Sequence, residues 1–217
     1  MYNMKHTLIV AGGEVNAKHL SRCLEKNKYD EIIAVDGGLV YLDALNISPD
    51  VVVGDFDTVD KSLLDKYAES RIIVLNPVKD STDTEEALDY AISKDAKHID
   101  IIGALGGRLD HTIGNLYLLK KAYEQKVSVR ILSDNNEVYI ISEYAKVYTK
   151  GYKYVSLIQF DGPAKGVTLK GFDYIVDDYD FDTSKTYRLG ISNEIHNEYG
   201  EVFIKEGYML VILSKDN

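Results

Sequence analysis

The first 132 residues alternate between two patterns of apolar and polar positions. Short runs of aliphatic residues, typical of buried strands, alternate with longer segments whose apolar residues recur at helical spacing. Strands are predicted at 7–11, 31–35, 51–53, 71–75, 99–102 and 127–132. Helices are predicted at 16–28, 38–45, 60–70, 82–93 and 109–125. Strands that alternate with helices indicate an α/β fold, a doubly wound and mainly parallel sheet with helices on both faces.

Two of the predicted helices carry more detailed signals. Thr82 and Glu85 have the spacing of a capping box at the start of helix 82–93. An apolar stripe at helical spacing follows them: Ala87, Leu88, Ala91 and Ile92. In helix 109–125, the side chains predicted to be buried are Ile113, Leu116 and Leu119.

Helical periodicity ends at the polar segment 133–136. Beyond it, short segments of alternating apolar and polar residues are separated by turn residues, such as those at 161–163 and 206–207. This pattern predicts a smaller all-β domain that is sandwich-like or an open barrel. We therefore expect an α/β domain at 1–132 and a β domain at 137–217.

Composition excludes several classes of function. The net charge of −10 argues against a nucleic-acid partner, because phosphate backbones require basic stripes, but it does not argue against a nucleotide. The single cysteine, Cys23, excludes an intramolecular disulfide and a thiolate metal site. The chain contains neither a signal-peptide pattern nor an apolar run of membrane-spanning length, so we expect a cytoplasmic protein without a membrane partner.

Carboxylates follow the predicted strands at one edge of the sheet. Asp55 and Asp57 come two positions apart after strand 51–53, so they share a face. Asp80 and Asp83 lie across the start of helix 82–93. Four anions at one edge repel one another, and Mg²⁺, which prefers carboxylates together with substrate phosphates, would remove that repulsion. The alternative is a set of solvated turn and helix-start carboxylates.

A glycine-containing loop, 103–108, follows a strand and opens a helix. The backbone N–H groups of Gly106 and Gly107 can form an anion cradle, and the guanidinium of Arg108 can grip two phosphate oxygens. Lys79 fits either a solvated loop lysine or a phosphate clamp. These residues favour a phosphate-bearing ligand at the same edge of the sheet.

Four motifs in this order and spacing resemble thiamine pyrophosphokinase: Asp36-Gly37-Gly38, Gly54-Asp55-Phe56-Asp57, Lys79-Asp80-Ser81-Thr82-Asp83 and Gly106-Gly107-Arg108-Leu109-Asp110-His111. The resemblance continues into the β domain at Ile191-Ser192-Asn193-Glu194 and covers nearly the whole chain. It implies transfer of the β,γ-pyrophosphoryl group of ATP to the hydroxyl of thiamine, which gives thiamine diphosphate and AMP. It also implies a catalytic α/β domain, a thiamine-binding β-sandwich domain, and a homodimer with its active sites between subunits.

The residues and the resemblance together give a predicted site. Mg²⁺ is assigned to Asp55, Asp57, Asp80 and Asp83. ATP is assigned to Asp36, Lys79, Thr82, Gly106, Gly107 and Arg108. The proton of the thiamine hydroxyl is assigned to Asp83 or Asp110. Thiamine is assigned to Ser192, Asn193 and an aromatic side chain, Tyr174 or Phe172, because this chain lacks the tryptophan that eukaryotic members of the family carry near thiamine.

Two other functions fit parts of the pattern. A Mg²⁺-dependent phosphohydrolase would use the same aspartates to activate water, without an organic acceptor. A nucleotide- or thiamine-sensing module would bind its ligand without turnover. AMP formation that depends on thiamine separates both alternatives from a pyrophosphokinase.

Overall fold

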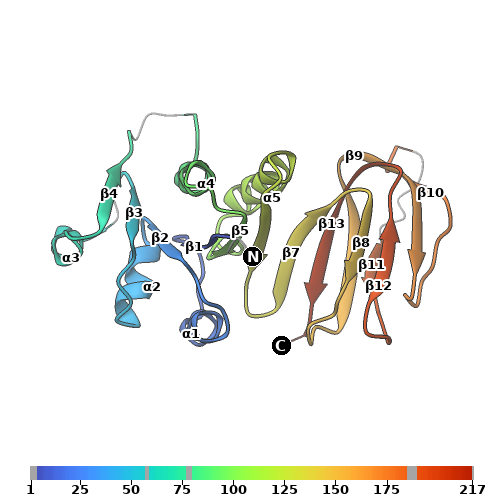
Figure 1. The fold of residues 1–217 in the computed structure, drawn as a ribbon, viewed down its shortest axis with the longest axis horizontal. Coiled ribbons are helices and arrows are strands. Elements are labelled where there is room, and N and C mark those ends of the chain that lie inside the picture. The colour runs from blue at the N-terminus through green and yellow to red at the C-terminus, as the bar shows by residue number, and fades with distance from the viewer. Residues whose placement is uncertain (1–3, 57–58, 77–79, 185–189, 217) are drawn as a thin grey trace. The chain divides into compact units, whose positions relative to one another are not determined.

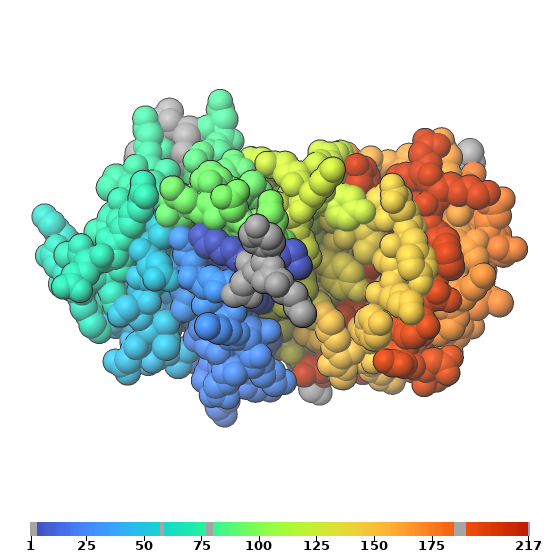
Figure 2. Space-filling view, viewed as in Figure 1, coloured from blue at the N-terminus to red at the C-terminus, as the bar shows by residue number. Residues whose placement is uncertain are grey.

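The computed structural model describes residues 4–56, 59–76, 80–184 and 190–216. The chain forms two compact units, Met1–Asp134 and Asn135–Asn217 (Figure 1). Side chains fill the spaces between the ribbons within each unit (Figure 2). No helix in the described ranges is both long and apolar enough to cross a membrane.

The first unit contains a parallel sheet between two layers of helices. Its strands are β1 (His6–Val10), β2 (Glu31–Val35), β3 (Val51–Gly54), β4 (Arg71–Val74), β5 (His98–Ile102) and β6 (Ser128–Leu132), in the order β4-β3-β2-β1-β5-β6. Every neighbouring pair among them is parallel. Its helices are α1 (Ala17–Lys26), α2 (Gly38–Ala44), α3 (Lys61–Lys66), α4 (Asp83–Ser93) and α5 (Leu109–Glu124). In Figure 1, α4 and α5 lie on one face of the sheet, and α1 and α2 lie on the other. The predicted α/β class is confirmed.

The helices cover the sheet because every second strand residue points to the same face. Leu8 and Val10 of β1 pack in one cluster with Leu20 of α1 and with Leu39 and Leu42 of α2. All five of these side chains are fully buried. A parallel sheet that is covered on both faces requires apolar strands, which explains why aliphatic runs located the strands well.

Helix α5 confirms one of the three residues predicted to be buried, Leu119, whereas Leu116 is half-buried and Ile113 is exposed. Ile113 is 48% exposed, and the buried side chains are Asn115, Leu118, Leu119 and Ala122. Asn115 is tolerated in this stripe because its amide donates a hydrogen bond to the Ala104 carbonyl at 2.9 Å. An apolar count misses such a position, because a buried polar group is acceptable once it is hydrogen-bonded.

One carboxylate, that of Asp100 on β5, is buried inside the first unit with 1% of its surface exposed. Arg130 of β6 donates two hydrogen bonds to it, each of 2.8 Å, and the Tyr29 hydroxyl donates a third of 2.9 Å. His6 Nε2 lies 3.2 Å from the same group. Burial alone would raise the pKa of Asp100, but the hydrogen bonds from His6 and Tyr29 and the charge of Arg130 hold its pKa below the usual value.

The strand order creates a crevice at the carboxyl ends of β1 and β5. From β1 the chain continues to β2, β3 and β4 on one side, and β5 then pairs with β1 on the other side. Ligands of open α/β sheets bind at such a switch point. The two loops pass so closely here that a Cβ on Gly13 would lie 2.3 Å from the Gly103 carbonyl oxygen, which only glycine permits.

The second unit is built from antiparallel strands. They are β7 (Asn136–Ile141), β8 (Tyr144–Val147), β9 (Tyr154–Lys170), β10 (Tyr179–Phe181), β11 (Gly190–Asn193), β12 (Gly200–Phe203) and β13 (Glu206–Ser214). The long strand β9 pairs with β10, β11, β12 and β13. Its inward side chains, among them Val155, Leu157, Val167 and Leu169, join the core of this unit.

The turn predicted at 161–163 is wrong. These residues lie inside β9, where the pairing with β13 shifts register between Glu206 and Tyr208. Asp161 (φ 56°) and Gly162 (φ 127°) take up the irregular backbone there. Turn-forming residues also occur at bulges, where they bend a strand without ending it.

Candidate active site

A cavity of about 760 Å³ lies in the first unit, at the carboxyl ends of its strands. The loops after β1, β2, β3 and β5 and the first turns of α4 and α5 supply its lining residues. Ala11, Gly12 and Gly13 come from the loop after β1, and Gly103 and Ala104 come from the loop after β5. The cavity therefore occupies the switch point of the sheet.

Three carboxylates meet on one side of this cavity. Asp36 follows β2, Asp55 follows β3 and Asp83 begins α4, and each offers an oxygen within 4.8 Å of the other two. Asp36 has a left-handed backbone (φ 44°), so its side chain departs from the alternation of β2. Asp83 is held at the helix start by the Thr82 cap, whose hydroxyl accepts a hydrogen bond of 3.2 Å from the Glu85 N–H.

The electrostatics of this group favour a cation. Burial, a hydrogen bond with Asp83 and the charges of Asp83 and Asp55 raise the pKa of Asp36 to about 7, although the Phe56 N–H opposes the shift. Neighbouring like charges disfavour ionisation of all three groups at once. A divalent cation reverses this effect, and a donor set made only of carboxylate oxygens is one that Mg²⁺ accepts.

Gly54 leaves the space that the Asp36 carboxylate occupies. A Cβ at position 54 would lie 1.8 Å from Asp36 Oδ1. The short β3 strand must therefore end in glycine for the carboxylates to meet. In the motif Gly54-Asp55, the glycine thus leaves space for the Asp36 side chain, and the aspartate supplies a candidate metal ligand.

We expect Gly54→Ala to lower turnover about a hundredfold, because displacing a positioned group by about 1 Å has an effect of that size. Steady-state kinetics would measure the loss. Gly114→Ala is the matched control, because a Cβ there meets no atom within 4 Å. Wild-type turnover in Gly54→Ala would show that the position of Asp36 does not matter.

The predicted carboxylates divide into three sets. Asp55 and Asp83 belong to the group, and Asp36, which was assigned to ATP, joins them. Asp80 is exposed and lies outside the group. Asp57 lies outside the described residues. The alternation of side chains along a strand could not reveal that Asp36, whose backbone is left-handed, supplies the third carboxylate.

The predicted phosphate-binding residues that the structure describes line the same cavity. Gly106 (φ 88°), Gly107 (φ 64°), Arg108 and Thr82 all contribute to its wall. Lys79 lies outside the described residues. Positive φ angles at two successive glycines turn the loop into the first turn of α5, where backbone N–H groups favour an anion.

Asp110 lies apart from the carboxylate group, in an exposed ion pair with Arg108. Arg108 Nη2 lies 2.6 Å from Asp110 Oδ2, and Nε lies 3.2 Å from Oδ1. The hydrogen bond from Arg108 is the main cause that lowers the pKa of Asp110. Asp110 is not among the residues that line the cavity, and this position argues against it as the proton acceptor.

The cavity also contains residues that the sequence did not single out as ligands. Tyr41 donates a hydrogen bond of 2.9 Å to the Gly13 carbonyl, and Asn115 fixes the loop after β5 through Ala104. Glu14 lies against Gly106, where a Cβ would come within 3.0 Å of its carboxylate. The only sequence feature that pointed to this part of the cavity lining was the pair Gly12-Gly13 after the first strand.

In the second unit, the residues predicted to bind thiamine differ in availability. Ser192 is exposed, has a φ of 55°, and donates its N–H to Ser156 Oγ at 3.0 Å. Tyr174 is 73% exposed. Phe172, the other aromatic alternative, is buried in the core of this unit, so Tyr174 is the one that a ligand can reach.

Asn193 is a buried clamp between two segments, with 3% of its surface exposed. Its amide oxygen accepts hydrogen bonds from the N–H groups of Tyr174 (2.9 Å) and Glu194 (3.0 Å). Its amide nitrogen donates to the Tyr174 carbonyl at 2.8 Å. These bonds give Asn193 a structural task that the motif alone does not reveal.

Known proteins resemble the chain over nearly its full length. The family model described as "Thiamin pyrophosphokinase, catalytic domain" matches residues 23–131, and the model "Thiamin pyrophosphokinase, vitamin B1 binding domain" matches residues 139–209. Thiamine pyrophosphokinase of Bacillus subtilis is 32% identical over 219 residues, which cover 98% of this chain and 100% of that protein.

Solved structures agree with this match. The crystal structure of thiamin pyrophosphokinase from Geobacillus thermodenitrificans has a TM-score of 0.84 at 29% identity and covers 98% of both chains. The Candida albicans enzyme has a TM-score of 0.83 at 17% identity, over 98% of this chain and 90% of that one, and shows the shared fold alone. The chain belongs to the thiamine pyrophosphokinase family.

Proposed function

We propose that this ATP-dependent thiamine diphosphokinase binds ATP and Mg²⁺ in the cavity of its first unit and transfers the β,γ-pyrophosphoryl group to thiamine. The observation that carries the proposal is the meeting of Asp36, Asp55 and Asp83 within 4.8 Å beside a glycine loop at a helix start. The cavity of about 760 Å³ falls within the usual size range of ligand sites.

The three carboxylates are the proposed ligands of Mg²⁺, and Asp57 remains a proposed fourth. When bound, the cation neutralises charge on the phosphate oxygens. Because the three aspartates come from separate loops on one sheet, the chain holds them in place before the substrates arrive. Positioning and charge neutralisation supply most of the catalysis in transfers of this kind.

Other residues that line the cavity are proposed to bind the phosphates of ATP. The N–H groups of Gly106 and Gly107, the Thr82 hydroxyl and the Arg108 guanidinium all border the cavity. Lys79 stays a proposed phosphate ligand. Arg108 would exchange its exposed partner Asp110 for phosphate oxygens, which a planar guanidinium binds through two parallel hydrogen bonds.

We assign the proton of the thiamine hydroxyl to Asp83. It belongs to the carboxylate group that lines the cavity, whereas Asp110 lies outside that group and outside the cavity lining. Ser192 and Tyr174 of the second unit are the proposed contacts for thiamine, and the cationic thiazolium suits an aromatic face. Asn193 is proposed to affect thiamine binding indirectly, because its hydrogen bonds fix the backbone at Tyr174.

A cytoplasmic homodimer is the proposed working form. Leu109 (70% exposed), Ile113 (48%) and Tyr117 (49%) recur every four residues along α5 and make an exposed apolar stripe. Such a stripe supports association with a second copy, because exposed apolar surface favours burial. The resemblance to the family points to the same state.

The decisive experiment combines the protein, Mg²⁺, ATP and thiamine and follows AMP. We expect AMP and thiamine diphosphate to form in equal amounts, and only when thiamine is present. ATP consumption without thiamine would indicate a phosphohydrolase. Tight binding of both ligands without AMP would indicate a sensing module.

A further inference from the structure

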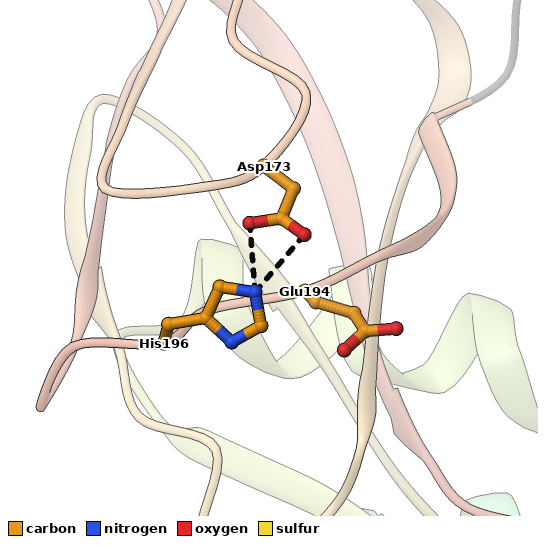
Figure 3. Close-up of side chains that lie close together, drawn as sticks. All are labelled: Asp173, Glu194 and His196. Atoms are coloured by element: carbon orange, nitrogen blue, oxygen red, sulfur yellow. Dashed lines mark hydrogen bonds and ion pairs between the residues drawn. The ribbon is translucent and has the colours of Figure 1, made fainter.

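A second cluster of metal-ligating side chains lies in the second unit, outside the cavity of the first. It consists of Asp173, Glu194 and His196, whose ligand atoms lie within 4.8 Å of one another. His196 Nε2 is 3.1 Å from an Asp173 carboxylate oxygen. Figure 3 shows the Asp173 carboxylate directed at this ring nitrogen, with Glu194 beside the pair. None of the three has a part in the proposed pyrophosphoryl transfer.

The backbone beneath this cluster is fixed, while its side-chain ends reach solvent. The Asp173 N–H donates a hydrogen bond of 3.0 Å to the Glu194 carbonyl, and the buried Asn193 clamps the same two segments. The side chains of Asp173 and His196 are 43% and 70% exposed, so their ends can rotate. The fold thus brings three ligands from two segments to one point and leaves them accessible.

The donor set differs from that of the aspartate group. One imidazole nitrogen and two carboxylate oxygens suit Zn²⁺ and similar transition metals, whereas Mg²⁺ prefers oxygen ligands alone. Bond lengths of about 2.0–2.2 Å place the ligands of a tetrahedral Zn²⁺ about 3.3 Å apart, so the ligand atoms, which lie within 4.8 Å of one another, have to approach by at most about 1.5 Å. Rotation of exposed side chains supplies such a change.

An ion pair between His196 and Asp173 explains only part of this arrangement. An exposed pair of this kind adds about 0–1 kcal/mol and needs no third group. Glu194 adds a second carboxylate at the same point, so even with His196 protonated the three groups carry a net negative charge. A bound dication would balance that charge and use all three ligands.

We propose that Asp173, Glu194 and His196 bind one Zn²⁺-type ion, with the fourth position open to water or to an exogenous ligand. The ion fastens the segment that carries Tyr174 to the segment that follows Ser192. This proposal does not depend on the assignment of the active site, because the experiment that tests it measures metal binding and not turnover.

The experiment titrates Zn²⁺ into the full chain in a large excess of Mg²⁺, which competes for the all-oxygen aspartate group. We expect one Zn²⁺ site by calorimetry, and a shift of the His196 ring signals in the NMR spectrum. His196→Asn should weaken Zn²⁺ affinity at least about tenfold, since losing even an outer partner of a metal site costs 10–100-fold. Co²⁺ should give visible d–d bands that His196→Asn abolishes.

Glu198→Gln is the matched control, because it removes an exposed carboxylate of the same segment that lies outside the cluster. We expect it to bind Zn²⁺ like the wild type. Thermal unfolding without metal should be unchanged in both variants, which separates ligand loss from misfolding. Equal Zn²⁺ affinity in the wild type and His196→Asn, or complete displacement of Zn²⁺ by Mg²⁺, would overturn the proposal.

Discussion

Asp55→Asn is expected to lower kcat by about two orders of magnitude or more, while the fold stays intact. Asparagine keeps the shape of the side chain but removes one charge from the group formed with Asp36 and Asp83. At the proposed Mg²⁺ site the remaining carboxylates would bind the cation less tightly, so the variant should also need more Mg²⁺ for half-maximal activity. Initial rates of AMP formation at saturating ATP and thiamine, over a Mg²⁺ titration, measure both effects.

Asp80→Asn is the sharpest control for that prediction. It makes the same chemical change three residues before the start of α4, at a residue that is exposed and outside the group. Its kcat and its Mg²⁺ requirement should stay close to those of the wild type. If Asp80→Asn lost as much activity as Asp55→Asn, the cation would have to sit elsewhere along this edge.

The second large effect concerns stability. Asp100→Asn should lower the free energy of unfolding by about 3 kcal/mol, because it leaves the Arg130 guanidinium without its buried counter-charge. Urea unfolding at neutral pH, extrapolated to water, measures the difference. Asp65→Asn, on the exposed surface of α3, is the control and should stay within about 0.5 kcal/mol of the wild type.

The difference between the wild type and Asp100→Asn should depend on pH in a defined direction. The pKa of Asp100 is lower in the folded than in the unfolded chain, so its ionised form stabilises the fold above the unfolded pKa of about 3.9. This stabilisation is lost as the pH falls through the folded pKa. Unfolding experiments below about pH 4 should therefore show a smaller difference between the two proteins. A difference that grew on acidification would contradict the network.

The helices and strands of the first unit were predictable because the residues within each element carry the signal for it. A buried parallel strand is mainly apolar, so an aliphatic run such as Val51–Gly54 identifies a strand in the sequence. Helix α4 was marked by its Thr82 cap in the same way. Counting apolar residues identified Leu119 on the buried face of α5 but could not identify Asn115, because the hydrogen bond that stabilises this amide comes from the folded loop after β5.

The sequence could predict at which edge of the sheet the candidate site lies, but not which carboxylates form it. Glycine and aspartate at the carboxyl ends of the strands located the edge, since parallel strands bring those ends together. Which carboxylates meet depends on backbone angles that no spacing rule reveals. Asp36 enters the group through its left-handed backbone and the space left by Gly54, whereas Asp80 stays exposed.

The buried position of Asn193 changes how kinetic data on its variants must be understood. Replacing it removes three hydrogen bonds that order the chain around Tyr174 and Glu194. A rise in the thiamine KM of such a variant would therefore report a loosened segment, even if the amide never touches the vitamin. Only variants of the exposed Ser192 and Tyr174 can separate direct recognition from order in this part of the enzyme.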